Sequence, residues 1–321
     1  QQDIDELEKD IHSSQDFSKI QGRFNTRLSL SSANADEVIK KRLLEKNDSG
    51  KDAVQLLYTS EVKASLRNKI NFSDGTISVK KYDTLKDLSE FFPMIPYQLD
   101  LLQQVFTKIR ENSSAGKHFA SGERNLLGAV QYAALEYAEK NLGILVPFQT
   151  FYGHLDQGLD HSVRATIIKA QSTPTLQSFD VDVLKVLYLI RYLKSVPSTV
   201  ENITTLMLDE LDADRLKLTE DITAALDRLT KEYLVQRTGL EYLFLTNEEQ
   251  DINREINHMD IPTSKMQSYI GEMIYDTVLE LKKYKYVPFA EKKIVAYDFD
   301  CAKWIDESAR GNATAEIGIH V

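Results

Sequence analysis

The stretch DVDVLKVLYLIRYL, from Asp180 to Leu193, is apolar on almost every side when it is drawn as a helix. A helix of that kind is normally buried in a protein core. The stretch lies inside a chain of 321 residues, which is long enough for two or three domains. We therefore expect residues 180–193 to form the buried centre of one domain.

The segments after this helix supply the other elements of that domain. Ser198 and Glu201 fit a capping box that opens a second helix. Thr219 is expected to cap a third helix. Residues 234–245 then have the pattern of two strands around a tight turn. Three helices followed by a hairpin is the winged-helix arrangement, which we expect over residues 173–257.

The preceding residues, 33–172, have the pattern of a small helical domain. One helix is expected at about residues 53–68 and another at about residues 123–141. Between them, the two prolines of the segment Phe92–Tyr97 favour an extended backbone. That segment leads into a helix whose apolar residues recur at helical spacing as far as Ile109.

The two ends of the chain are expected to contain strands. Residues 27–32 look like a short strand, which places residues 1–32 at the end of a preceding domain. In residues 258–321, a long amphipathic helix is expected after Ser264, and apolar residues alternate with polar ones from Val295 to Cys301. The predicted fold class is mainly α: a helical bundle, a winged helix and the start of an α+β unit.

Composition restricts the partners and the compartment. The formal net charge of -10 removes the general attraction to phosphate backbones, so any DNA binding must be weak or local. The single cysteine, Cys301, excludes an internal disulfide and fits a reducing compartment. No apolar run reaches the length of a membrane-spanning helix. We expect a cytoplasmic fragment of a longer protein with no membrane partner.

The sequence has no complete catalytic constellation. Gly116-Lys117-His118 and Gly50-Lys51-Asp52 each imitate the end of a phosphate-binding loop. Neither has Ser or Thr after the lysine, and each lacks the glycine five positions earlier. The six histidines have no spacing typical of metal ligands, so no metal site is expected. Catalysis cannot be complete within this chain.

Two arginines near the N-terminus are candidate catalytic residues. Arg23 lies just before the expected strand, and Arg27 lies at its start. In oligomeric ATPases, an arginine at a subunit edge can stabilise the charge on a neighbour's γ-phosphate in the transition state. The alternative is that these arginines are solvated or paired with Asp16 or Glu37.

Arg124 is a candidate for anion binding. If Ser121 is an N-cap, Arg124 lies in the first turn of a helix, where a cation opposes the helix dipole at a cost of about 0.3 to 1 kcal/mol. A bound anion would account for an arginine at this position. The alternative is that Glu123, beside it, offsets the cost.

The third helix of the expected winged helix has little positive charge on its outward side. Arg228 and Lys231 are nearly balanced there by Asp221 and Asp227. A helix that reads the major groove normally needs a positive surface. We therefore favour a protein contact or a structural role over DNA binding. Arg237 in the hairpin is the best candidate for a phosphate contact, and Arg228 and Lys231 are the other candidate contacts to DNA or a partner.

Three strings of the sequence resemble one known family. They are GRFNTRLSLSSANADEVI from Gly22 to Ile39, FPMIPYQLDLLQ from Phe92 to Gln103, and GKHFASGERNLL from Gly116 to Leu127. In these strings the chain resembles the BrxC and PglY family of AAA+ ATPases from BREX phage-defence systems. The resemblance implies that residues 1–32 end an AAA+ core and that residues 33–172 form its helical lid.

The resemblance also implies roles for single residues and for partners. Gln2 would lie near the sensor 1 position, Arg23 at the arginine-finger position with Arg27 as a substitute, and Arg124 at the sensor 2 position. The intact protein would use ATP and Mg²⁺, form a homo-oligomer, and act with other BREX components, including a DNA methyltransferase, against phage DNA. The chain departs from the family pattern because it lacks Walker A and Walker B motifs, so it is not expected to bind or hydrolyse ATP by itself.

Two other functions fit the same pattern. Origin-recognition ATPases also place a winged helix after the lid, so the chain could be the DNA-binding part of an initiator or a regulator. It could also be a structural scaffold. Tight, salt-dependent binding to duplex DNA would favour the initiator.

Overall fold

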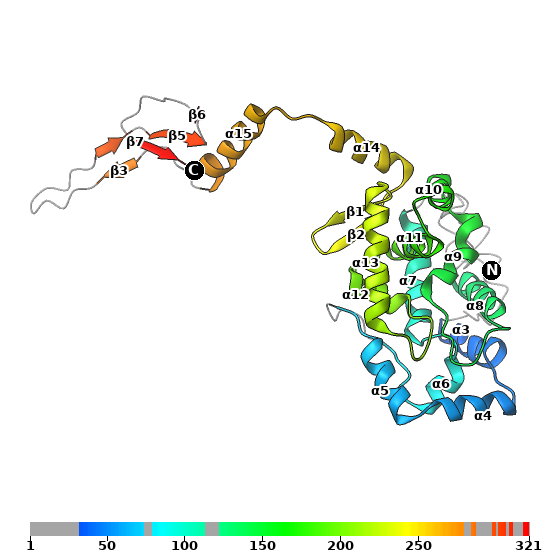
Figure 1. Ribbon diagram of the computed structural model, residues 1–321. Coiled ribbons are helices and arrows are strands. Elements are labelled where there is room, and N and C mark those ends of the chain that lie inside the picture. The colour runs from blue at the N-terminus through cyan, green and yellow to red at the C-terminus, as the bar shows by residue number, and fades with distance from the viewer. Residues whose placement is uncertain are drawn as a thin grey trace, which may run out of the picture. The chain divides into compact units, whose positions relative to one another are not determined.

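The computed structural model describes residues 32–73, 79–112, 122–278, 284–286, 297–299, 301–305, 308–310 and 317–320. The chain divides after Arg254 into two compact units, which are described separately here. The described residues are mainly helical, with a helical bundle followed by a unit that combines helix and strands (Figure 1). The predicted fold class is confirmed at this level, and the finer domain boundaries stay predictions.

The first unit begins with a series of helices that we call the N-terminal helical part. Its elements are α3 (Ser32–Val38), the π-helix η1 (Ile39–Leu43), α4 (Asp48–Leu57), α5 (Ser60–Lys69), α6 (Leu85–Phe91), α7 (Tyr97–Asn112), α8 (Gly122–Glu136), the short helices η3 (Phe148–Phe151), α9 (Tyr152–Leu155) and η4 (Asp156–Gly158), and α10 (His161–Ser172). The prediction of one helix at residues 53–68 is wrong in one respect, because the chain forms two helices there, α4 and α5. Thr59 causes the division: its side chain accepts a hydrogen bond from the backbone N–H of Val62 and so caps α5.

Helix α7 is central to this part, as its apolar periodicity predicted. Leu99, Leu102, Val105, Phe106 and Ile109 are all buried. Gln98 is also fully buried, and its amide is satisfied on both sides. Its side-chain oxygen accepts from the N–H of Ile95 (2.9 Å), and its amide nitrogen donates to the carbonyl of Val146 (2.7 Å). These bonds hold the segment between α6 and α7 against the chain that enters η3.

Two glycines allow α8 and α9 to approach closely. A Cβ atom added to Gly128 in α8 would lie 2.5 Å from Cε1 of His154 in α9. In the opposite direction, a Cβ added to Gly153 in α9 would meet the hydroxyl of Tyr132 in α8. Each helix therefore places a ring over a glycine of the other, so the crossing depends on the absence of two side chains.

The rest of the first unit, which we call the hairpin part, surrounds the apolar helix that was predicted at residues 180–193. It contains α11 (Ser178–Ile190), α12 (Val200–Leu206), α13 (Arg215–Lys231), β1 (Val235–Thr238) and β2 (Glu241–Phe244). Helix α11 contacts α10, α12, α13 and β2, and its apolar residues are buried as predicted. Helix α13 contacts α11 and β1, while α11 also contacts β2 directly.

Two helix starts differ from the sequence prediction. Helix α12 is capped by Thr199, not Ser198, because the Thr199 hydroxyl accepts from the N–H of Asn202. Helix α13 starts four residues before Thr219, because the carboxylate of Asp214 accepts from two backbone N–H groups there. Thr219 lies inside the helix, where its hydroxyl donates to the carbonyl of Arg215.

The hairpin of β1 and β2 is antiparallel, with Val235 opposite Phe244 and Thr238 opposite Glu241. Gly239, with φ of 64°, makes the turn. Thr199, just before α12, forms an isolated antiparallel bridge with Glu241. The hairpin is therefore anchored to the chain that leads into α12.

Helix α14 (Asn247–His258) follows the hairpin and contains the point at which the two units divide. The second unit contains α15 (Thr263–Gly271), the π-helix η5 (Glu272–Val278) and the strands β3 (Tyr284–Tyr286), β4 (Tyr297–Phe299), β5 (Cys301–Ile305), β6 (Ser308–Arg310) and β7 (Ile317–His320). Strands β3 and β4 pair antiparallel, and β5 lies between antiparallel β6 and parallel β7. The hydroxyl of Tyr275 donates to the carbonyl of Trp304 (2.6 Å), which joins η5 to β5.

Candidate functional site

The candidate residues at the start of the chain, Gln2, Arg23 and Arg27, lie outside the described residues. Their roles as nucleotide-binding and catalytic residues stay predictions. Within the described ranges, no group of three or more His, Cys, Asp or Glu side chains could hold a metal ion. No helix there is long and apolar enough to cross a membrane.

Arg124 is the third residue of α8, which starts at Gly122. Its backbone therefore lies in the first turn of a helix, the position from which anion binding was inferred. Its side chain lies outside the described residues. One turn further along α8, Gly128 lies under the half-buried ring of His154, and burial lowers the pKa of that imidazole.

Arg228 already has an acidic partner within the chain. Its Nε donates to Oδ2 of Asp180 (2.8 Å) and its Nη2 to Oδ1 (2.6 Å), a two-point ion pair between α13 and α11. These hydrogen bonds raise the pKa of Arg228 further. The Arg228 side chain is 30% exposed, while the Asp180 side chain is fully buried. The guanidinium is therefore engaged in holding two helices together.

Asp180 has a second function that explains its burial at the start of an apolar helix. Its carboxylate accepts from the backbone N–H of Gln177 (2.9 Å) in a capping box that opens α11. The apolar pattern of the sequence placed Asp180 only at the start of the buried stretch. An aspartate three residues into a helix is a capping signal, but nothing local in the sequence identifies Arg228 as its partner.

The other two candidate contacts are on the surface. Lys231 is exposed at the end of α13. Arg237 is exposed on β1, where its guanidinium lies 5.7 Å from the ring centroid of Tyr242 and its Nε donates to the carbonyl of Gly239. Asp221 and Asp227, both on α13, are also exposed. The outward side of this helix is therefore mixed in charge, as expected from the sequence.

A further arginine, which the sequence analysis missed, lies at the start of α13. Arg215 donates through Nη1 to the carbonyl of Lys69 and to the hydroxyl of Thr205 (3.0 Å), and through Nη2 to the carbonyl of Glu201 (3.3 Å). Burial lowers the pKa of this guanidinium. The cation at the start of α13 is thus bound to carbonyls of the chain itself. Because these partners are distant in sequence, no local pattern predicts the bonds.

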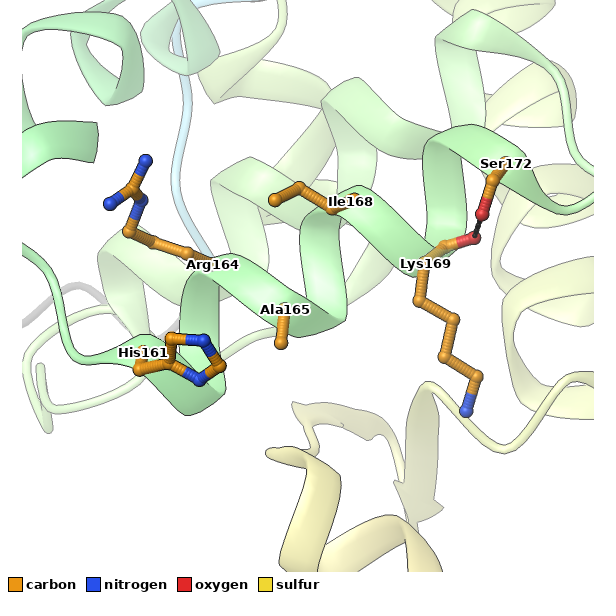
Figure 2. Close-up of a pocket in the computed structure, with 6 residues that line it drawn as sticks. All are labelled: His161, Arg164, Ala165, Ile168, Lys169 and Ser172. Atoms are coloured by element: carbon orange, nitrogen blue, oxygen red, sulfur yellow. Dashed lines mark hydrogen bonds between the residues drawn. The ribbon is translucent and has the colours of Figure 1, made fainter.

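A surface hollow of about 420 Å³ follows α10. Figure 2 shows its described lining along that helix: His161, Arg164, Ala165, Ile168, Lys169 and Ser172. Arg164 lies 3.6 Å from the carboxylate of Asp156, and Lys169 donates to the side-chain oxygen of Gln250 (2.8 Å). Burial is the main cause that lowers the pKa of Lys169, and the positive charge of Arg254 lowers it further. Arg164 and Lys169 thus have partners within the chain, and we assign this hollow no ligand.

Comparison with known proteins gives one family match. Residues 259–321 match the family model described as the BREX ATP-binding protein BrxC, fourth domain with six-stranded beta sheet. No solved structure matches the chain. The matched segment begins just before α15 and includes every described strand of the second unit. This match supports a BrxC-like protein of a BREX system.

Proposed function

We propose that the chain is part of an ATP-hydrolysing AAA+ protein of a BREX phage-defence system. Two separate parts of the sequence support this proposal. The C-terminal segment matches the fourth domain of an ATP-binding BREX protein, and the strings between Gly22 and Leu127 resemble the same family. The match and the resemblance cover different residues, so each supports the proposal independently.

In this proposal the chain supplies arginines and a docking module, while the nucleotide-binding loop belongs to other parts of the protein. Arg23, or Arg27 in its place, would reach a neighbouring subunit's nucleotide in a homo-oligomer. Arg124, at the start of α8, and Gln2 would face the nucleotide of their own subunit. When ATP and Mg²⁺ are bound, arginines at these positions would stabilise the charge on the γ-phosphate. The described residues contain no metal site of their own.

We also propose that α11 to β2 form a winged helix that docks on protein and does not read DNA. The observation that carries this proposal is the internal use of both arginines of α13. Arg215 is bound to backbone carbonyls and Arg228 to buried Asp180. A recognition helix needs its cations free for phosphates and base edges. With these two arginines engaged, exposed Lys217 and Lys231 remain on α13 and Arg237 on β1, together with exposed Asp221 and Asp227. The docking partner in this proposal is another BREX component, such as the methyltransferase.

A DNA titration tests the docking proposal. Fluorescence anisotropy of a labelled duplex with the full chain should show a Kd no tighter than about 1 µM. Lys231→Ala and Arg237→Ala should each change that weak binding only slightly. Tight binding that falls steeply between about 50 and 200 mM salt would overturn the proposal in favour of a DNA-binding initiator.

Turnover in the longer protein, which carries the Walker motifs, tests the ATPase proposal. Arg23→Ala and Arg124→Ala should each lower ATP turnover by about 10³-fold, a loss typical of removing an arginine that stabilises the transition state. Arg67→Ala, at an exposed position on α5, is the matched control and should leave turnover unchanged. Full turnover in both test variants would refute these two assignments.

A further inference from the structure

Besides the chain that links α10 to α11, contacts at several places join the N-terminal helical part to the hairpin part. Thr166 and Lys169 on α10 bond to the side chains of Asn247 and Gln250. Three further connections start from α5 and α7, from the chain after α8, and from α9. We infer that the two parts form one rigid arm, so that a displacement of α8 moves the hairpin of β1 and β2 by the same rotation. Both parts lie within the first compact unit. This inference stands without the proposed function.

The first connection is a latch formed by residues 69–73, which begin at the last residue of α5 and contact α12 and α13. The hydroxyl of Thr205 donates to the carbonyl of Asn71 (2.6 Å), and the N–H of Ser73 donates to the side-chain oxygen of Asn202 (2.8 Å). Arg215 donates to the carbonyl of Lys69. Asn202 and Thr205 are fully buried. Buried polar groups of this kind cannot exchange these partners for water while the fold is intact.

Aromatic packing and a lysine strengthen the latch. Phe72 packs edge-to-face against Tyr97 at the start of α7, with ring centroids 5.2 Å apart. The Tyr97 hydroxyl donates to the carbonyl of Thr205 in α12 (3.2 Å). Lys69 donates to the carbonyl of Leu211, just before α13 (3.1 Å). The latch thus connects α5, α7, α12 and α13.

The second connection is a strap between residues 143–145 and 209–211. The N–H of Leu145 donates to the carbonyl of Asp209 (2.7 Å), and the N–H of Leu211 donates to the carbonyl of Gly143 (2.9 Å). Ile144 and Glu210 form an antiparallel bridge between them. Since residues 143–145 follow soon after α8, this strap connects the C-terminal side of α8 to the loop before α13.

The third connection is an aromatic row that crosses the core. Tyr152 of α9 packs edge-to-face against Tyr188 of α11, with centroids 6.1 Å apart, and Tyr188 packs in the same way against Phe244 of β2 (5.3 Å). Helix α9 in turn crosses α8 through Gly128 and Gly153. A single connection would act as a pivot, and two would define a hinge axis. Three separate connections leave no hinge.

Spin labels can test this rigidity in the full chain. Cys301, the single cysteine, is first replaced by serine. Labels at Leu135→Cys on α8 and Leu240→Cys on the hairpin turn then report the distance between the two parts, since these side chains are 69% and 77% exposed. Double electron–electron resonance should give one narrow distance distribution. A broad or two-peaked distribution would overturn the inference.

The latch is tested by weakening it. Ser73→Ala removes the contacts of the Ser73 hydroxyl with Thr199 and Asn202 (3.2 Å each). Arg215→Met removes the bonds to Lys69 and Thr205. Both variants, alone or together, leave the strap and the aromatic row in place. Because fewer bonds then hold the two parts at the latch, the Leu135–Leu240 distribution should widen with each substitution. A control pair inside the hairpin part, Glu220→Cys with Leu240→Cys, should keep its width, which shows that the variant is folded. Unchanged width of the first pair in the double variant would overturn the role of the latch.

Discussion

Replacement of Arg228 by methionine should destabilise the first unit strongly, because it leaves the carboxylate of Asp180 buried without its cation. The variant loses two charge-assisted hydrogen bonds, while the N–H of Gln177 still donates to the carboxylate. Removing one member of a buried ion pair costs about 3–5 kcal/mol. Since the arginine side is 30% exposed, water can partly replace the guanidinium. We therefore expect a loss of about 3 kcal/mol in the free energy of unfolding.

The assay is urea denaturation followed by far-UV circular dichroism. The single tryptophan, Trp304, belongs to the second unit and would report the wrong transition. Adding Asp180→Asn to Arg228→Met removes the buried charge. The double variant should therefore lose less free energy of unfolding than the two single variants lose in sum. The matched control is Lys185→Met, which breaks a partly exposed pair with Asp182 and should cost about 0–1 kcal/mol. If Arg228→Met lowers the free energy of unfolding no more than this control, the buried carboxylate of Asp180 does not depend on Arg228.

Two further predictions concern a lysine and a glycine of the N-terminal helical part. The Lys46 ammonium donates to the carbonyls of Leu44 (2.8 Å) and Phe92 (2.6 Å), and burial lowers its pKa to about 8. Since the unfolded chain holds this proton up to a pKa near 10.5, stability should rise between about pH 8 and pH 10. Partial exposure limits the gain to about 1 kcal/mol, and Lys46→Met should abolish it in urea denaturation at the two pH values. Gly128→Ala should cost about 1–3 kcal/mol in the same assay, because the new methyl group meets the ring of His154. Gly153→Ala should cost less, because the Tyr132 side chain that it meets is 40% exposed and can swing outward; an equal loss in both variants would contradict this account.

The spacing of apolar residues predicted the central elements of this fold correctly. The apolar stripe of α7, the nearly all-apolar α11 and the two strands at residues 234–245 each occur where the pattern indicated. These elements are long, and many apolar residues define each one, so a single exception does not change the interpretation. The helical part of the predicted fold class depended on these elements.

Helix starts were predicted less well, because a cap depends on one or two side chains. Ser198 and Thr219 have suitable chemistry, yet Thr199 and Asp214 cap the helices. In the same way, the hydroxyl of Thr59 interrupts a pattern that continues on either side of it. Several residues near each start could accept a backbone N–H, and packing chooses among them.

The pairing of Arg228 could not be predicted from the sequence. Its position on α13 placed it among outward residues, but its partner, Asp180, lies 48 residues earlier in the chain. Ion pairs at such a separation depend on how two helices cross, which no local pattern specifies. The same is true of Arg215, whose partner Lys69 lies 146 residues away. Both arginines bear directly on whether the third helix can contact DNA.

The double use of Asp180 has a consequence for protein synthesis. The first turn of α11 leaves the ribosome 48 residues before the cation that neutralises its buried carboxylate. Until that cation arrives, we expect the start of α11 to stay hydrated, so the nascent chain should not complete this core before Arg228 has been translated. The same dependence limits where the gene can be cut for expression: residues 177–228 should be kept together in any shortened version.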